Sequence, residues 1–179
     1  MSNLDPLLER NQAFARAGGH LGISPMPEHQ LFIVSCIDPR VDPAHILGAG
    51  LGDALVLRNA GGRVTNEVID EIAFIAQLTE TMFGDDAPSF EVAVVHHTSC
   101  GTRFLADDAF RRSFASRIDA DETELAAAAV TDPIQSVRRD VEKLATSPLV
   151  PSRMTVSGHV YDVDTGLVET VVPVAIGVS

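Results

Sequence analysis

Two stretches of this sequence carry the residue types that bind transition metals. Cys36 follows the apolar run at residues 31–35, while His97 and Cys100 close a second apolar run that begins at residue 90. Two thiolates and one imidazole suit Zn²⁺, and the H-x-x-C spacing lets one turn of backbone direct both side chains at one point. Three protein ligands leave one tetrahedral position open, as in catalytic zinc sites. The pattern predicts a catalytic metal centre.

Asp38 and Arg40 alternate with Cys36 in the stretch "SCIDPR". In an extended chain these three positions share a face, so Arg40 can hold the carboxylate of Asp38 through a bidentate fork. Two thiolates already neutralise a divalent ion. We therefore expect Asp38 to gate the open metal position or accept a proton there, with Arg40 holding it off the metal. Asp38 as a fourth ligand is the alternative.

Other interpretations of these residues compete with the metal site. A buried cysteine is by itself most often a small core residue, and a Cys–His pair can also form a nucleophilic site. The nucleophile hypothesis leaves the second cysteine without a role. His96 must face away from His97 on an extended strand, so packing in the core or behind the ligands is expected for it. His45, on a short helix after the motif, is expected to have no role at the site.

The stretch "RNAGG" contributes the candidate substrate pocket, which comprises Asn59, Ala60, Gly61 and Gly62. It lacks the G-x-G-x-x-G or G-K-[ST] pattern of a phosphate-binding loop. Glycines permit close approach of two backbones. We therefore expect Gly61 and Gly62 to make space near the metal and Asn59 to hydrogen-bond locally.

Strands alternate with helices along the chain. Apolar runs of strand length occupy residues 31–35, 54–59 and 90–97, and Asp-Pro pairs at 5–6, 42–43 and 132–133 predict helix starts with the aspartate as N-cap. Apolar spacings of three and four predict a helix over 68–83, and residues 154–172 resemble a hairpin about "DTG". This order predicts an α/β fold, with a mainly parallel central sheet flanked by helices on both faces and an antiparallel edge strand. Ligands of such sheets bind beyond the carboxyl ends of the strands.

Composition narrows the classes of partner. The 179 residues are expected to form one domain, 1–179. Thirteen basic and twenty-five acidic residues give a formal charge of −12, which disfavours nucleic acid and anionic membrane surfaces as partners. The N-terminal stretch "MSNLDPLLERNQ" lacks a basic and an apolar signal region, so a cytoplasmic location is expected. A reducing compartment argues against a disulfide between the two cysteines.

Together the motifs resemble the β-class carbonic anhydrases. The resemblance rests on "CIDPR", "RNAGG" and "HHTSCG", and extends over "SVRRDVEKLATSPLVP" and "GHVYDVDTG" in the short clade of the family. It implies hydration of carbon dioxide to bicarbonate and a proton by zinc-bound hydroxide, with one Zn²⁺ per chain. It also implies that the metal ligands are Cys36, His97 and Cys100, and that Asp38 and Arg40 form a catalytic dyad.

The resemblance also implies a homodimer or a higher homo-oligomer. Residues 1–25 are the candidate N-terminal helical arm, which in this family commonly reaches across to the partner. Relatives in the short clade hydrolyse carbonyl sulfide or carbon disulfide at the same zinc motif, so these linear molecules are alternative substrates. A non-catalytic zinc protein of the same fold is the remaining alternative.

Overall fold

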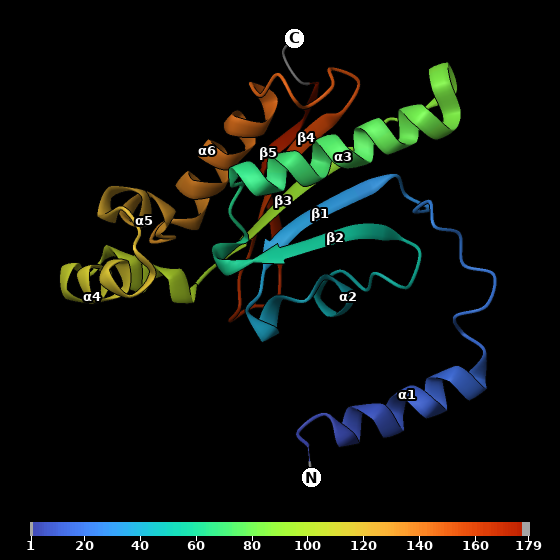
Figure 1. Ribbon diagram of the computed structural model, residues 1–179, viewed down its shortest axis with the longest axis horizontal. Helices are drawn as coiled ribbons and strands as arrows, with labels where there is room; N and C mark the ends of the chain where they lie inside the picture. Colours follow the sequence, from blue (N-terminus) through green and yellow to red (C-terminus); the bar gives the residue numbers. More distant parts are fainter. Residues whose placement is uncertain (1, 177–179) are drawn as a thin grey trace.

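A five-stranded sheet forms the centre of the chain (Figure 1). The structure is a computed structural model and describes residues 2–176. The strands are β1 (Leu31–Cys36), β2 (Ala54–Asn59), β3 (Glu91–His97), β4 (Thr155–Tyr161) and β5 (Val168–Ile176), in the order β2-β1-β3-β4-β5. The first four are parallel, and β5 pairs antiparallel with β4. The predicted fold class, including its antiparallel edge strand, is confirmed.

Six α-helices connect or precede the strands. They are α1 (Asp5–Ala17), α2 (Pro43–Ile46), α3 (Asn66–Phe83), α4 (Asp108–Ile118), α5 (Glu122–Ala128) and α6 (Pro133–Ala145). Asp42 and Asp132 cap α2 and α6 as predicted, since their carboxylates accept the N–H of Ala44 and Gln135. The prediction for the first helix was wrong by one position. There Asp5 is the first helical residue and Leu4 is the N-cap.

The direction of each crossover decides which face its helix covers. The chain moves one way along the sheet from β1 to β2, and the opposite way from β2 to β3 and from β3 to β4. Right-handed connections therefore place α3 and α6 on one face and α2 on the other. The largest core cluster agrees, because it joins α3 and α6 to alternate residues of the strands, among them Val34, Val94 and Val156. Helices flank both faces of the sheet, but the long helices α3 and α6 lie on the same face.

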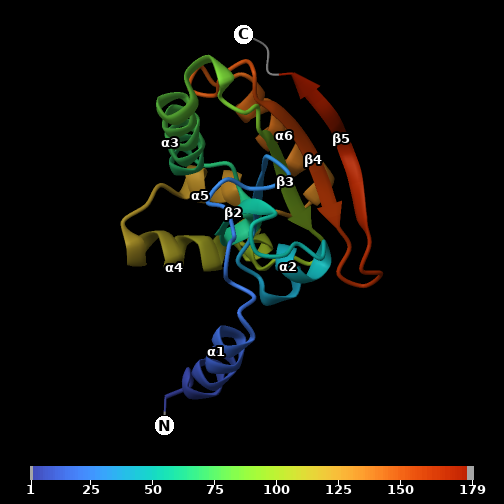
Figure 2. The same cartoon turned by 90° about the vertical axis from the view of Figure 1, so that its right-hand side faces the viewer.

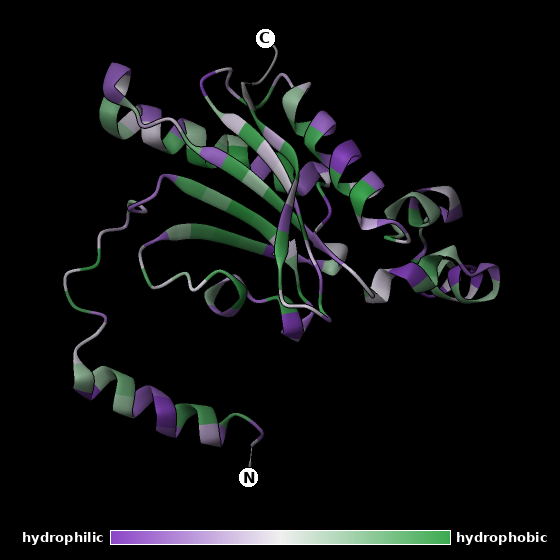
Figure 3. Ribbon diagram, turned by 180° about the vertical axis from the view of Figure 1, so that it is seen from behind, coloured by the Kyte–Doolittle hydropathy of each residue, from purple (hydrophilic) through white to green (hydrophobic). Residues whose placement is uncertain are grey.

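Helix α1 lies apart from the sheet in both views (Figures 1 and 2). None of its residues is buried, and Leu7, Leu8 and Phe14 are 52%, 49% and 41% exposed. Hydrophobic and hydrophilic residues alternate along its ribbon (Figure 3). Over residues 2–176, no helix has both the length and the apolar character needed to cross a membrane.

The parallel register brings the chemically interesting strand ends to one edge. Cys36 pairs with Asn59 of β2, and Ser35 pairs with Val95 of β3. His97, two residues after Val95, therefore ends its strand beside the end of β1. A separation of about sixty residues in sequence becomes adjacency in space.

Candidate metal centre

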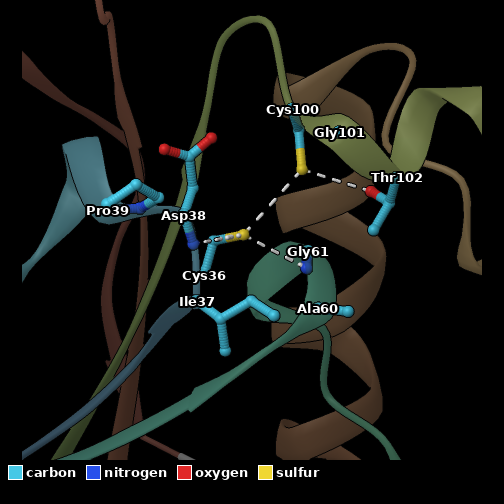
Figure 4. A pocket seen from close by; sticks show the side chains of 9 residues that line it. All are labelled: Cys36, Ile37, Asp38, Pro39, Ala60, Gly61, Cys100, Gly101 and Thr102. Carbon is cyan, nitrogen blue, oxygen red and sulfur yellow. Dashed lines mark hydrogen bonds between the residues drawn. The ribbon is translucent and has the colours of Figure 1, made fainter. Parts of the chain in front are cut away.

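Cys36, His97 and Cys100 converge at this edge, as predicted. Cys36 ends β1, His97 ends β3, and Cys100 directly precedes a 3-10 turn over Gly101–Ala106. Their ligand atoms all lie within 4.8 Å of one another, and all three residues are buried. Figure 4 shows the two sulfur atoms facing each other. Three atoms from three segments thus surround one point.

The donor set fits a tetrahedral zinc ion. His97 Nδ1 lies 2.9 Å from the carbonyl oxygen of Thr98, which accepts its hydrogen and leaves Nε2 with a free lone pair. Nε2 is buried and has no hydrogen-bond partner in the structure. The Cys36 and Cys100 sulfurs are 4.0 Å apart, close to the ~3.8 Å that two Zn–S bonds of 2.3 Å give at a tetrahedral angle. These three buried atoms form a cluster that could hold a metal ion.

Backbone amides support the first sulfur. Asp38 N and Gly61 N lie 3.4 Å and 3.3 Å from Cys36 Sγ. The hydrogen bond to Cys100 and burial raise the pKa of Cys36, whereas the same hydrogen bond lowers the pKa of Cys100. The shared hydrogen bond therefore favours the thiolate form of Cys100 and the thiol form of Cys36.

Asp38 and Arg40 form the expected pair, but not on an extended strand. The strand ends at Cys36, and Pro39 begins a 3-10 turn that Asp38 caps by accepting the N–H of Arg40. Arg40 Nε and Nη2 donate to the two carboxylate oxygens over 3.0 Å and 2.7 Å. These bonds lower the pKa of Asp38 to about 2. The prediction of the pair was right; its assumed backbone geometry was wrong, because a proline favours the turn.

Arg40 also links the two metal-binding loops. Its Nη2 donates to the carbonyl oxygen of Ser99 over 3.2 Å, between the two ligands of the second loop. Ser99 has a positive φ of 56°, a conformation that is costly outside glycine and that directs this carbonyl. One guanidinium therefore orients Asp38 and fixes its distance from the second loop.

Arg58 supports the site, although it was not among the residues predicted from the sequence. Its Nε donates to the carbonyl of Cys36 over 2.8 Å and its Nη2 to the carbonyl of Asp38 over 2.7 Å. A third nitrogen pairs with Asp42, the cap of α2. Arg58 therefore fixes the backbone on both sides of Ile37. Its place at the carboxyl end of β2 was the signal available in the sequence.

A buried ion pair lies behind the centre. Asp140 of α6 accepts hydrogen bonds from Arg63 Nε and Nη2 over 2.7 Å and 2.9 Å, and from Val64 N over 3.1 Å. His96 Nε2 lies 3.1 Å from the same carboxylate, and its Nδ1 lies 3.0 Å from Ser136. Burial raises the pKa of Asp140, but these hydrogen bonds outweigh burial and bring it to about 2. His96 thus faces away from the metal, as predicted.

A small cavity of about 350 Å³ opens beside the sulfurs. Ala60 and Gly61 line it, together with Ile37, Pro39 and Thr102 (Figure 4). Most of its wall is therefore apolar, as suits a nonpolar ligand.

Two of the four predicted pocket residues lie behind the cavity wall. Asn59 hydrogen-bonds both backbone groups of Arg63, over 2.7 Å and 2.8 Å. Gly62 has a φ of +64°, and a Cβ there would lie 3.0 Å from the backbone of Cys36 and of Ser35. Both residues therefore shape the loop instead of contacting the cavity. The predicted close approach of backbones is present.

Comparison with known proteins agrees with the fold and the site. The sequence profile described as carbonic anhydrase matches residues 31–111. Beta-carbonic anhydrase 1 of Mycobacterium tuberculosis is 33% identical over 178 residues, which is 97% of this chain and 100% of that protein. The solved carbonic anhydrase of Streptococcus mutans is 37% identical with a TM-score of 0.77, over 96% of this chain and 98% of that one.

The chain therefore belongs to the β-carbonic anhydrase family. A carbon disulfide hydrolase of Acidithiobacillus thiooxidans is 30% identical over 156 residues, or 76% of this chain and 74% of that protein. The family thus includes relatives named for two different substrates. Its carbonic anhydrases use zinc, and the Cys36, His97 and Cys100 cluster is the place in this chain where a metal could bind.

Proposed function

We propose that this protein is a zinc-dependent lyase that hydrates carbon dioxide to bicarbonate and a proton. One observation carries the proposal: a buried, unpartnered His97 Nε2 converges with two cysteine sulfurs at an apolar cavity. Cys36, His97 and Cys100 are the proposed ligands of one Zn²⁺ per chain. When bound there, zinc supplies the Lewis acidity that lets water ionise near pH 7.

Asp38 and Arg40 are the proposed catalytic residues beside the metal. The carboxylate of Asp38 stays ionised at neutral pH, because Arg40 lowers its pKa to about 2. An ionised carboxylate at this place can accept a hydrogen bond and orient the attacking oxygen. Arg40 keeps the carboxylate in that role by occupying both of its oxygens. Release of the carboxylate would let it compete for the open metal position.

The cavity suits a small linear substrate. Carbon dioxide is uncharged and nonpolar overall, so it gains from an apolar wall formed by residues such as Ile37, Pro39 and Ala60. Reaction converts it into a charged product. An apolar wall that accepts the substrate but solvates bicarbonate poorly favours product release.

Carbonyl sulfide or carbon disulfide hydrolysis is the second candidate function. The carbon disulfide hydrolase relative supports it, and both molecules share the linear shape of carbon dioxide. Stopped-flow hydration of carbon dioxide should be compared with sulfide release from carbonyl sulfide and carbon disulfide on one zinc-loaded sample. We expect hydration to be much the faster reaction. Faster sulfide release would assign the protein to the second function.

We further propose that the single domain, 1–179, acts as a homodimer or a higher homo-oligomer, with residues 1–25 as an arm to the partner. Support comes from α1, which buries none of its residues and exposes the side chains of Leu7, Leu8 and Phe14. An exposed apolar helix of this kind is stabilised by a second surface. A non-catalytic zinc protein is the remaining alternative, and the intact Asp38–Arg40 pair disfavours it.

A further inference from the structure

The two sulfurs of the candidate metal centre differ in their contacts with side chains. Cys36 Sγ faces the backbone N–H groups of Asp38 and Gly61, which no substitution of a side chain removes. Cys100 Sγ lies 3.2 Å from the hydroxyl oxygen of Thr102. Among residues 2–176, Thr102 is the residue outside Cys36, His97 and Cys100 whose side chain hydrogen-bonds to one of the two sulfurs.

The Thr102 side chain occupies space next to Gly61. A Cβ on Gly61 would lie 3.1 Å from Thr102 Oγ1 and 3.3 Å from its methyl carbon. Thr102 is half-buried, and its branched Cβ limits rotation about χ1. Gly61 thus leaves the space that the Thr102 side chain occupies, and Figure 4 shows the hydroxyl directed at the Cys100 sulfur.

We propose that Thr102 is a positioning residue for the Cys100 thiolate, whose hydroxyl donates a hydrogen bond to the sulfur and tunes its bond to the metal. The inference rests on the proposed metal site. A metal-bound thiolate carries no hydrogen, so in the contact the threonine hydroxyl must be the donor. A donated hydrogen bond withdraws charge from the sulfur, and hydrogen bonds to ligating atoms orient them and adjust the metal.

This role reaches the reaction through the metal. A sulfur that donates less charge leaves the metal a stronger Lewis acid toward its fourth ligand. Thr102 also lines the substrate cavity, so its hydroxyl acts within the same small volume as the substrate. We assign Thr102 to tuning Cys100 instead of binding substrate, because its hydroxyl lies within hydrogen-bond distance of the Cys100 sulfur.

The test uses the protein loaded with Co²⁺, whose sulfur-to-metal charge-transfer band reports the charge on the thiolates. In Thr102→Val, which keeps the branched shape and removes the hydroxyl, the band should move to longer wavelength. Thr102→Ser, which keeps the donor, should stay near wild type.

Two further variants keep the result interpretable. Thr81→Val removes an exposed hydroxyl of α3 that donates to the carbonyl of Gln77, outside the candidate site, and should leave the band unchanged. Thr102→Ala must shift the band in the same direction if Thr102→Val fails to fold. If the bands of Thr102→Val and Thr102→Ala coincide with that of the wild type, the role of Thr102 is overturned, but the proposed metal site is not. Wild-type protein that takes up neither cobalt nor zinc would overturn the proposed metal site as well.

Discussion

At the scale of single residues, the carboxylate of Asp38 is the most closely constrained group at the rim of the centre. It accepts three hydrogen bonds from Arg40, and that guanidinium is itself anchored to Ser99. Charge-assisted bidentate pairs fix direction as well as distance. The constraint therefore holds a negative charge beside the Cys36, His97 and Cys100 cluster, paired with Arg40.

Replacement of Arg40 by alanine should release this carboxylate. We expect carbon dioxide hydration to fall about 10-fold or more, because partners of this kind typically carry that share of activity. Stopped-flow rates measured across pH are the readout. Arg103→Ala is the matched control, since Arg103 is exposed in the neighbouring turn and its guanidinium lies over Phe104. Turnover that stays at the wild-type level at every pH would remove Asp38 and Arg40 from the mechanism.

At the scale of elements, the loop after β2 packs against the ends of β1 and β3 without side chains between them. Gly62 approaches the backbone of Ser35 and Cys36, and its positive φ adds a second requirement for glycine. This packing brings the N–H of Gly61 to the Cys36 sulfur. The shape of the loop after β2 therefore determines which backbone N–H reaches the sulfur of Cys36.

A pair of glycine substitutions separates close approach from backbone strain. Gly62→Ala should lower the free energy of unfolding by about 2 to 4 kcal/mol, since it adds a clash to the cost of positive φ. Gly48→Ala, at φ +69° with open space around it, should cost only about 1 to 2 kcal/mol. Urea unfolding of both variants measures the difference. Equal losses would mean that the close approach has no energetic weight.

The Asp140 ion pair predicts a pH dependence of stability. Its pKa is lowered from 3.8 to about 2 in the folded chain, so its contribution is present above about pH 4 and is lost as pH falls toward 2. The shift corresponds to about 2 kcal/mol.

Metal-free wild type and Asp140→Asn are the proteins to compare, because zinc release then adds nothing to the profile. Their difference in unfolding free energy should shrink by about 2 kcal/mol between pH 5 and pH 2. A difference that is constant over this range would show that Asp140 is not held ionised by Arg63 and His96.

The positions of the strands could be predicted from the sequence, whereas the conformations of the loops could not. Strand ends could be located from apolar runs, and the parallel register then brought Cys36 and His97 together. The turn at Pro39 could not be separated from a continuing strand, because alternation of residue types fits both. Asp140 was missed because its partner Arg63 is 77 residues away. An acidic residue between Val137 and Leu144 on an apolar helix face was the available signal.

At the scale of the whole molecule, the exposed helix α1 is the feature that one chain leaves unexplained. It buries no residue, and Figure 2 shows it extending away from the sheet. Isolated helices of 13 residues are marginal in water. Packing against a second chain would provide the contacts that such a helix requires.

Polar substitutions on α1 should therefore change the state of association. Leu7 and Phe14 are seven residues apart and share one helix face. The double variant Leu7→Gln with Phe14→Gln should shift sedimentation toward the monomer. Leu167→Gln, at a residue 70% exposed in the turn between β4 and β5, is the control and should sediment as wild type. A double variant that associates like wild type would exclude this face of α1 from the interface.

The central claim is that the Cys36, His97 and Cys100 cluster is a catalytic zinc site for carbon dioxide. The most direct measurement is stopped-flow carbon dioxide hydration by wild-type protein whose zinc content has been determined on the same sample. We expect about one zinc per chain and a hydration rate far above that of buffer. Protein that holds one zinc per chain yet hydrates carbon dioxide no faster than buffer at any pH would contradict it.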